Sequence, residues 1–93
     1  MKTVHFKPGA ELTFKTIVEV QARLYRALQD ETSDHFTLDL SDVTHCDSAG
    51  IALLIEARKR CKNNNKTFKI VDMPLETQSL ADFCGVKNIL EMV

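Results

Sequence analysis

Hydrophobic and polar residues alternate over residues 36–40, and this is the clearest pattern in the chain. Phe36, Leu38 and Leu40 are separated by polar residues, as in a β-strand with one buried face. From Ile51 onward the apolar residues recur with helical spacing, which predicts a helix over about residues 48–62. A strand therefore runs into a helix through the short polar segment between them.

The junction between this strand and helix reads Asp47-Ser48-Ala49-Gly50. Asp47 or Ser48 can cap the free N–H groups of the first turn, and Gly50 allows close backbone packing there. One interpretation of Ser48 is a plain N-cap that stabilises the helix by around 1 kcal/mol. The other is a phosphorylatable hydroxyl at the positive end of the helix, where an added charge of about −1.5 to −2 is tolerated.

The remaining pattern predicts shorter elements on both sides of this unit. In chain order they are a strand over 3–6, a strand over 11–14, a helix over 15–29, a strand over 68–71, a helix that follows Pro74 and ends at Gly85, and a short helical segment over 86–92. Pro8-Gly9 is expected to join the first two strands into a hairpin. Leu75, Leu80 and Phe83 are the expected buried residues of the third helix.

The element order β-β-α-β-α-β-α-α predicts an α/β fold with parallel βαβ units and right-handed crossovers. We expect a mixed four-stranded sheet with the N-terminal hairpin at one edge and the helices packed mainly on one face. The 93 residues are expected to form one domain, 1–93.

Composition and charge exclude several classes of protein. Apolar content of 44% with 27% charged residues is ordinary for a folded domain, and a net charge of −1 gives no reason to expect nucleic acid as a partner. Basic residues do cluster near the end of the central helix, and we interpret them as a solvated helix end rather than a phosphate or lipid-headgroup patch. The cluster consists of Arg58, Lys59, Arg60, Lys62, Lys66 and Lys69.

Three cysteines, Cys46, Cys61 and Cys84, form no C-x-x-C pair, and an odd number argues against a disulfide framework. No apolar signal-peptide region follows Met1-Lys2, and no stretch approaches the roughly 20 apolar residues that span a bilayer. These features predict a cytoplasmic protein without direct membrane insertion.

The chemistry-bearing residues give no enzyme signature. His45, Cys46 and Asp47 are adjacent, but only His45 and Asp47 can share a face of an extended chain, whereas zinc needs about four converging ligands. Ser48 has His45 nearby in sequence, yet its flanks do not form the G-x-S-x-G elbow. We therefore expect no catalysis, metal or cofactor.

Residues 38–54 resemble the signature of the STAS domain family. In that family a strand with a Leu-x-Leu-Ser-x-Val pattern leads into Asp-[Ser/Thr]-x-Gly at the start of a helix, and here Leu38 to Val43 and Asp47 to Gly50 carry these patterns. The order of strands and helices is similar as well. The family includes anti-sigma factor antagonists, parts of anion transporters and the small subunit of the bacterial Mla phospholipid ABC transporter.

Within the family, Ala49 and Ala52 are similar to the transporter subunit, whereas the antagonists commonly read Asp-Ser-Ser-Gly-Leu-Gly. This resemblance implies a non-catalytic cytoplasmic subunit that binds and stabilises or regulates the ATPase of a phospholipid-transporting complex involved in outer-membrane lipid asymmetry. Such a subunit would lie at the inner membrane only through its partner. The alternative is an anti-sigma factor antagonist that binds an anti-sigma factor kinase and is switched by phosphorylation of Ser48.

By the same resemblance, Ser48 is a phospho-acceptor or a partner contact. The residues expected at the partner-binding surface are Asp47, Ser48, Ala49, Gly50 and Leu53. The apolar stripe of the central helix is wide, because Ile51, Leu53, Leu54 and Ile55 cannot all face the sheet. An exposed member of this stripe would suit a docking face.

Overall fold

The computed structural model describes residues 2–86 and Ile89. Its elements are β1 (Thr3–Phe6), β2 (Glu11–Leu12), α1 (Ile17–Leu28), β3 (His35–Asp39), β4 (His45–Cys46), α2 (Ser48–Asn63), β5 (Thr67–Val71) and α3 (Leu75–Phe83). Most of the helical segment expected over 86–92 lies outside the described residues. In the described part of the chain, no helix combines the length and apolar character needed to cross a bilayer.

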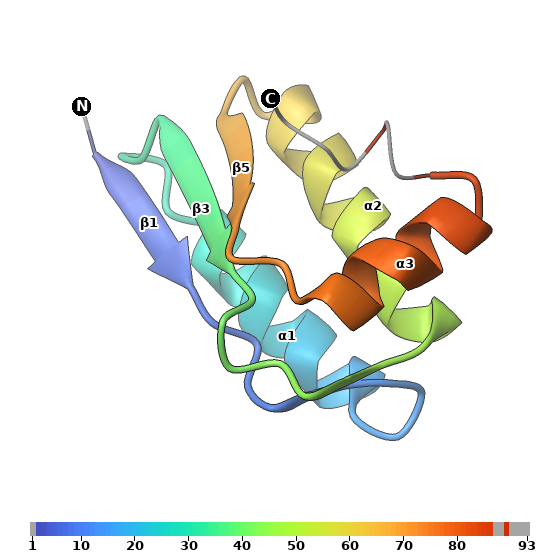
Figure 1. Cartoon of the computed structure of the whole chain (residues 1–93). Coiled ribbons are helices and arrows are strands. Elements are labelled where there is room, and N and C mark those ends of the chain that lie inside the picture. The colour runs from blue at the N-terminus through green and yellow to red at the C-terminus, as the bar shows by residue number, and fades with distance from the viewer. Residues whose placement is uncertain (1, 87–88, 90–93) are drawn as a thin grey trace.

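The main sheet has β3 at its centre, flanked by β1 and β5, and both pairings are parallel (Figure 1). Val4, Phe36 and Phe68 are in register across the three strands. Parallel neighbours require crossover connections, and α1 and α2 provide them. The α/β class and the parallel βαβ units expected from the sequence are therefore confirmed.

The predicted hairpin between β1 and β2 is wrong. β2 pairs in parallel with β4, with Leu12 opposite Cys46, and the two form a separate two-stranded sheet in place of a four-stranded mixed one. Thr44 and Asp47 extend this pairing, because their N–H groups donate to the Ala10 and Leu12 carbonyls at 2.7 and 3.2 Å. The backbone groups that a hairpin would need are thus used by a segment more than thirty residues away in sequence.

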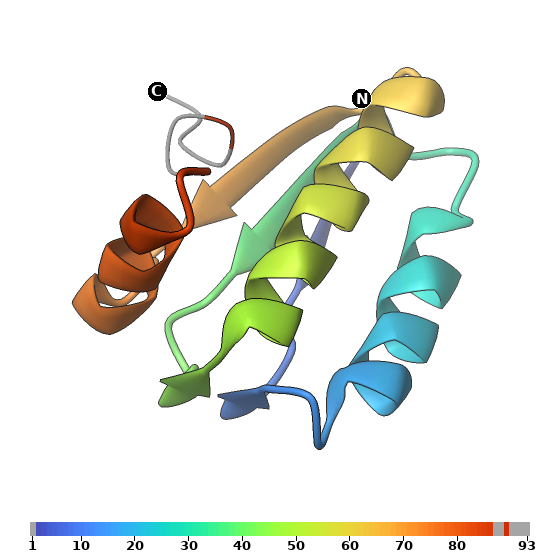
Figure 2. The same cartoon turned by 90° about the vertical axis from the view of Figure 1, so that its right-hand side faces the viewer.

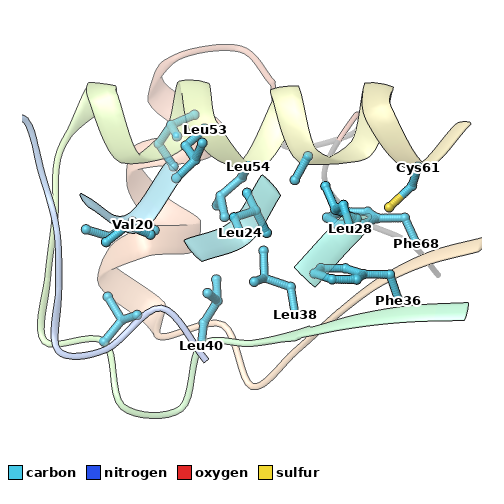
Figure 3. Close-up of a cluster of buried hydrophobic side chains, with 14 of the residues drawn as sticks. Val20, Leu24, Leu28, Phe36, Leu38, Leu40, Leu53, Leu54, Cys61 and Phe68 are labelled. Carbon is cyan, nitrogen blue, oxygen red and sulfur yellow. The ribbon is translucent and has the colours of Figure 1, made fainter. Parts of the chain in front are cut away.

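α1 and α2 cover one face of the main sheet, and α3 lies on the other side of α2 from α1, next to the end of β5 (Figure 2), so the helices are mainly on one face, as expected. Side chains from α1, α2 and the sheet interdigitate there, among them Leu24, Leu54 and Phe36, each 1% exposed (Figure 3). The opposite face carries alternate residues such as His5, Thr37 and Lys69, none of which is buried. This polar face explains why one layer of helices suffices.

Two expectations about apolar helix residues need correction. In α2, Ile51, Leu53 and Leu54 are buried and Ile55 is partly buried, because the sheet and both neighbouring helices surround this helix. No member of the stripe is therefore exposed for docking.

In α3, Leu75 and Phe83 are 78% and 90% exposed rather than buried, while Leu80 is partly buried as expected. Thr77 and Ala81 face inward instead. Smaller side chains at these two positions allow α3 to pack closely on α2 and β4.

Candidate functional site

Asp47 holds the junction between β4 and α2 together. It is the N-cap of α2, and its Oδ1 accepts hydrogen bonds from the N–H groups of Ala49 and Gly50 at 2.9 and 3.2 Å. Its Oδ2 accepts a third from the N–H of Phe14 at 3.0 Å. One carboxylate thus joins the start of α2 to the segment that leads into α1. These N–H donors, that of Phe14 first, hold the pKa of Asp47 below its ordinary value.

Replacing Asp47 with alanine is expected to lower the free energy of unfolding by about 2 kcal/mol, from one lost cap and one lost tie to Phe14. Asp47→Asn keeps an oxygen that can cap the helix and removes only the negative charge, so a comparison with the wild type measures the effect of the charge. Because the folded-state pKa is lowered, the charge stabilises the fold above the unfolded pKa of about 4 and stops doing so as pH falls through the folded value. Urea unfolding between about pH 3 and 7 should show the wild type losing its advantage over Asp47→Asn on the acid side. A constant difference across this range would contradict the assignment.

Ser48 is the first residue of α2 and is exposed. Of the two capping candidates, Asp47 takes the role, and among the described residues the Ser48 hydroxyl has no hydrogen-bond partner. The hydroxyl is therefore free to contact a partner or to accept a phosphoryl group. Negative charge at this position would lie at the positive end of the helix dipole.

Gly50 is required by a close approach between α2 and β2. A Cβ atom built on Gly50 would lie 2.2 Å from the Leu12 carbonyl oxygen and 2.8 Å from the Cys46 Sγ. Of the five residues expected at the partner-binding surface, Gly50 and Leu53 are buried. They support the surface by packing beneath it and are not themselves available to a partner. Asp47 and Ala49 are partly exposed.

Two exposed apolar side chains beside the junction escaped the sequence analysis. Phe14 and Val18 are 71% and 76% exposed, and Phe14 is tied by its N–H to Asp47. A groove between α1 and α2 is lined by Ile17, which precedes Val18 in the chain, and by Gln21, Tyr25, Ala49, Ala52, Leu53 and Glu56. Val18 offered a signal, because it lies off the buried track of Val20, Leu24 and Leu28. We call Phe14, Val18, Ser48, Ala49 and Ala52 the Ser48 surface.

The chemistry-bearing side chains at the junction do not converge. The ring Nδ1 of His45 lies 3.0 Å from the Thr44 hydroxyl, whereas the Asp47 carboxylate is occupied by backbone N–H groups. Burial raises the pKa of the Cys46 thiol to about 11, which keeps it protonated and a poor nucleophile near neutral pH. Within residues 2–86 and Ile89, no three His, Cys, Asp or Glu side chains gather into a metal-binding group.

A parallel α/β domain with an Asp-Ser-x-Gly junction at the start of its central helix is the arrangement that the sequence analysis compared with the STAS domain family. A model of the STAS domain family matches residues 2–93, and the chain belongs to that family. The resemblance seen in residues 38–54 is thereby confirmed.

Relatives fall into both branches named above. The intermembrane phospholipid transport system binding protein MlaB of Haemophilus influenzae is 40% identical over 50 residues, which cover 54% of this chain and 48% of that protein. The matched segment thus spans about half of that relative's length. The anti-sigma-B factor antagonist of Staphylococcus aureus is 28% identical over 91 residues, or 98% of this chain and 83% of the antagonist.

Solved structures show the same fold. A sulfate transporter family protein from Wolinella succinogenes superposes with a TM-score of 0.77 at 19% identity, covering 96% of this chain and 71% of that one. The anti-sigma factor antagonist SpoIIAA in its unphosphorylated form gives a TM-score of 0.74 at 14% identity, covering 97% and 78%.

Proposed function

We propose that this chain is a non-catalytic accessory subunit that binds the cytoplasmic ATPase of a phospholipid-transporting ABC complex and stabilises or regulates it. The observation that carries the proposal is the Ser48 surface: Ser48 is exposed, the preceding Asp47 holds the backbone N–H of Phe14, and the side chains of Phe14 and Val18 are largely exposed. The 40% identity to a phospholipid transport system binding protein includes half of the chain and supports this class of partner. In this proposal the chain reaches the inner membrane only through the ATPase.

The Ser48 surface is built for contact rather than for catalysis. Exposed aromatic side chains beside well-packed backbone are typical centres of protein interfaces. Phe14 cannot move far, because Asp47 holds its N–H and the adjacent Thr16 hydroxyl donates to the Glu11 carbonyl at 2.9 Å. A partner would therefore meet Phe14 on a fixed backbone, so little backbone ordering would be needed on binding.

The alternative is an anti-sigma factor antagonist, and the exposure of Ser48 favours it specifically. A phosphoryl group there would be accommodated by the helix dipole, so the fold would survive while a docked kinase would be repelled. The 28% identity to an antagonist over nearly the whole chain supports this second candidate.

Affinity purification of the tagged chain from its native host separates the two proposals. Recovery of an ABC ATPase together with a membrane permease supports the transporter subunit. Recovery of a small kinase, with phosphate on Ser48, supports the antagonist. Recovery of neither class would overturn both proposals.

Substitution of Ser48 gives a second, quantitative test. Ser48→Ala should leave ATPase binding within about threefold and the melting temperature within about 2 °C, because the hydroxyl is not the cap. If the chain is an antagonist, Ser48→Asp should abolish kinase binding at the same thermal stability. Binding is measured by titration calorimetry with the purified partner. If Ser48→Asp still binds the kinase, phosphorylation of Ser48 does not control kinase binding. If Ser48→Ala no longer binds the ATPase, the Ser48 hydroxyl is an essential contact rather than one at the edge of the interface.

A further inference from the structure

Positive charge is concentrated at the end of α2 opposite to Ser48. Residues 57–71 hold six Lys or Arg residues and no Asp or Glu. The whole chain has 12 basic and 13 acidic residues, so the remaining positions hold six basic and 13 acidic residues and carry a net charge of −7. A near-neutral total therefore hides a strongly basic end. The dipole of α2 places about half a negative charge at the C-terminus of the helix. One Lys or Arg is enough to balance that charge, so most of the six basic residues are in excess.

A surface hollow opens within this basic end, between the last turn of α2 and the start of β5. Its volume is about 350 Å³, at the lower end of the range for small-molecule sites. Its lining consists of Arg58, Lys62, Asn65, Lys66, Thr67 and Phe68, which we call the basic hollow. The neighbouring carboxylates of Glu31 and Asp34 line a different hollow, on the α1 side of the helix end.

The cations of the basic hollow are not neutralised within the described part of the chain. The Arg58 Nε is buried and finds no acceptor there. Neither Arg58 nor Lys62 forms an ion pair with a described carboxylate. By contrast, Arg60 is engaged elsewhere, since its Nε lies 3.5 Å from the Glu56 carboxylate and its guanidinium 3.7 Å from the Tyr25 ring centre.

Lys66 also lines the hollow, but its ammonium group is directed to the loop at residues 30–33. Its Nζ donates to the Asp30 carbonyl, the Ser33 carbonyl and the Ser33 hydroxyl at 2.6, 2.8 and 2.8 Å. These acceptors are uncharged, so they fix the ammonium in place without cancelling its charge. Lys66 therefore contributes a fixed positive charge beside the hollow rather than a donor inside it.

In place of the solvated helix end inferred from the sequence, we propose that the basic hollow binds a phosphate group, with Arg58 and Lys62 as its donors. The two residues are one helical turn apart and project side by side. A guanidinium fork matches the oxygens of a phosphate, and an ammonium one turn away adds a second charged hydrogen bond. The group belongs either to a soluble phosphate compound or to the headgroup of an anionic lipid. The hollow admits a phosphate with a small substituent.

Amide NMR titration of the whole chain tests this site, with pyrophosphate as the soluble probe and sodium chloride at matched ionic strength as the reference. Saturable shifts confined to Arg58, Lys62 and residues 65–67 are expected. Arg58→Gln/Lys62→Gln should bind at least about tenfold more weakly, because two charged hydrogen bonds are lost. Lys62→Gln alone, at an exposed position, should bind about threefold more weakly and guards against misfolding of the double variant. Lys15→Gln/Arg26→Gln removes the same charge at exposed positions elsewhere and should bind like the wild type.

Vesicle sedimentation distinguishes the two sources of phosphate. Binding to vesicles with about 30% phosphatidylglycerol, but not to pure phosphatidylcholine, assigns the site to lipid headgroups when the double variant loses it. Saturable pyrophosphate binding without vesicle binding assigns it to a soluble compound. Absence of saturable binding in both arms would overturn the proposal. Equal loss in the Lys15→Gln/Arg26→Gln control would also overturn it, since it would reveal only diffuse charge attraction.

Discussion

Gly50→Ala is expected to lower the free energy of unfolding by at least about 3 kcal/mol, a large share of the stability of a domain of this size. The new Cβ would lie 2.2 Å from the Leu12 carbonyl oxygen, which is backbone and is held by the N–H of Asp47. Relief therefore requires β2 to move away from α2. Alanine favours a helix interior over glycine by about 1 kcal/mol, but this gain is smaller than the steric cost.

Gly85→Ala is the matched control. Gly85 has φ +77, and apart from its chain neighbours no atom of the described residues lies within 4 Å of a Cβ built there, so only left-handed backbone strain of about 1 kcal/mol is expected. Urea unfolding followed by circular dichroism measures both variants. If both variants lose the same free energy of unfolding, the close approach of β2 to α2 at Gly50 does not contribute to stability. That result would also argue against the Asp47 junction as the feature that positions the Ser48 surface.

Phe14→Gln/Val18→Gln is expected to weaken binding to the proposed ATPase partner by about a hundredfold, because the two exposed apolar side chains of the Ser48 surface are removed together. Phe14→Gln alone should cost about tenfold. Both side chains are largely exposed, so the free energy of unfolding should change by less than about 1 kcal/mol. The Phe14 N–H remains available to Asp47 in both variants, since the donor is backbone.

Phe83→Gln provides the matched control for this experiment. Phe83 is 90% exposed and lies on α3, so the same substitution removes a similar aromatic surface outside the Ser48 surface. Calorimetric titration with the purified ATPase should show binding like that of the wild type. Loss of binding by Phe83→Gln with retention by Phe14→Gln would place the docking face on α3 instead.

Local patterns in the sequence determined the central unit of this protein. The alternation in β3, the helical spacing in α2 and the polar segment between them are properties of neighbouring residues, and the structure reproduces them almost to the residue. α2 ends at Asn63, close to the predicted end at about residue 62, and Asn65 just after it adopts φ 58, a left-handed conformation that asparagine tolerates better than most residues. The family resemblance rested on this same unit, and the family model that matches residues 2–93 confirmed it.

Tertiary structure alone decided the pairing of β2 and the environment of the site. Two short segments separated by more than thirty residues pair in parallel, and no local period encodes which free backbone edge a strand will meet. Asp47 rather than Ser48 caps α2 because its carboxylate also reaches the Phe14 N–H, a contact made only when β2 and β4 are side by side. That contact leaves the Ser48 hydroxyl free and places Phe14 beside it.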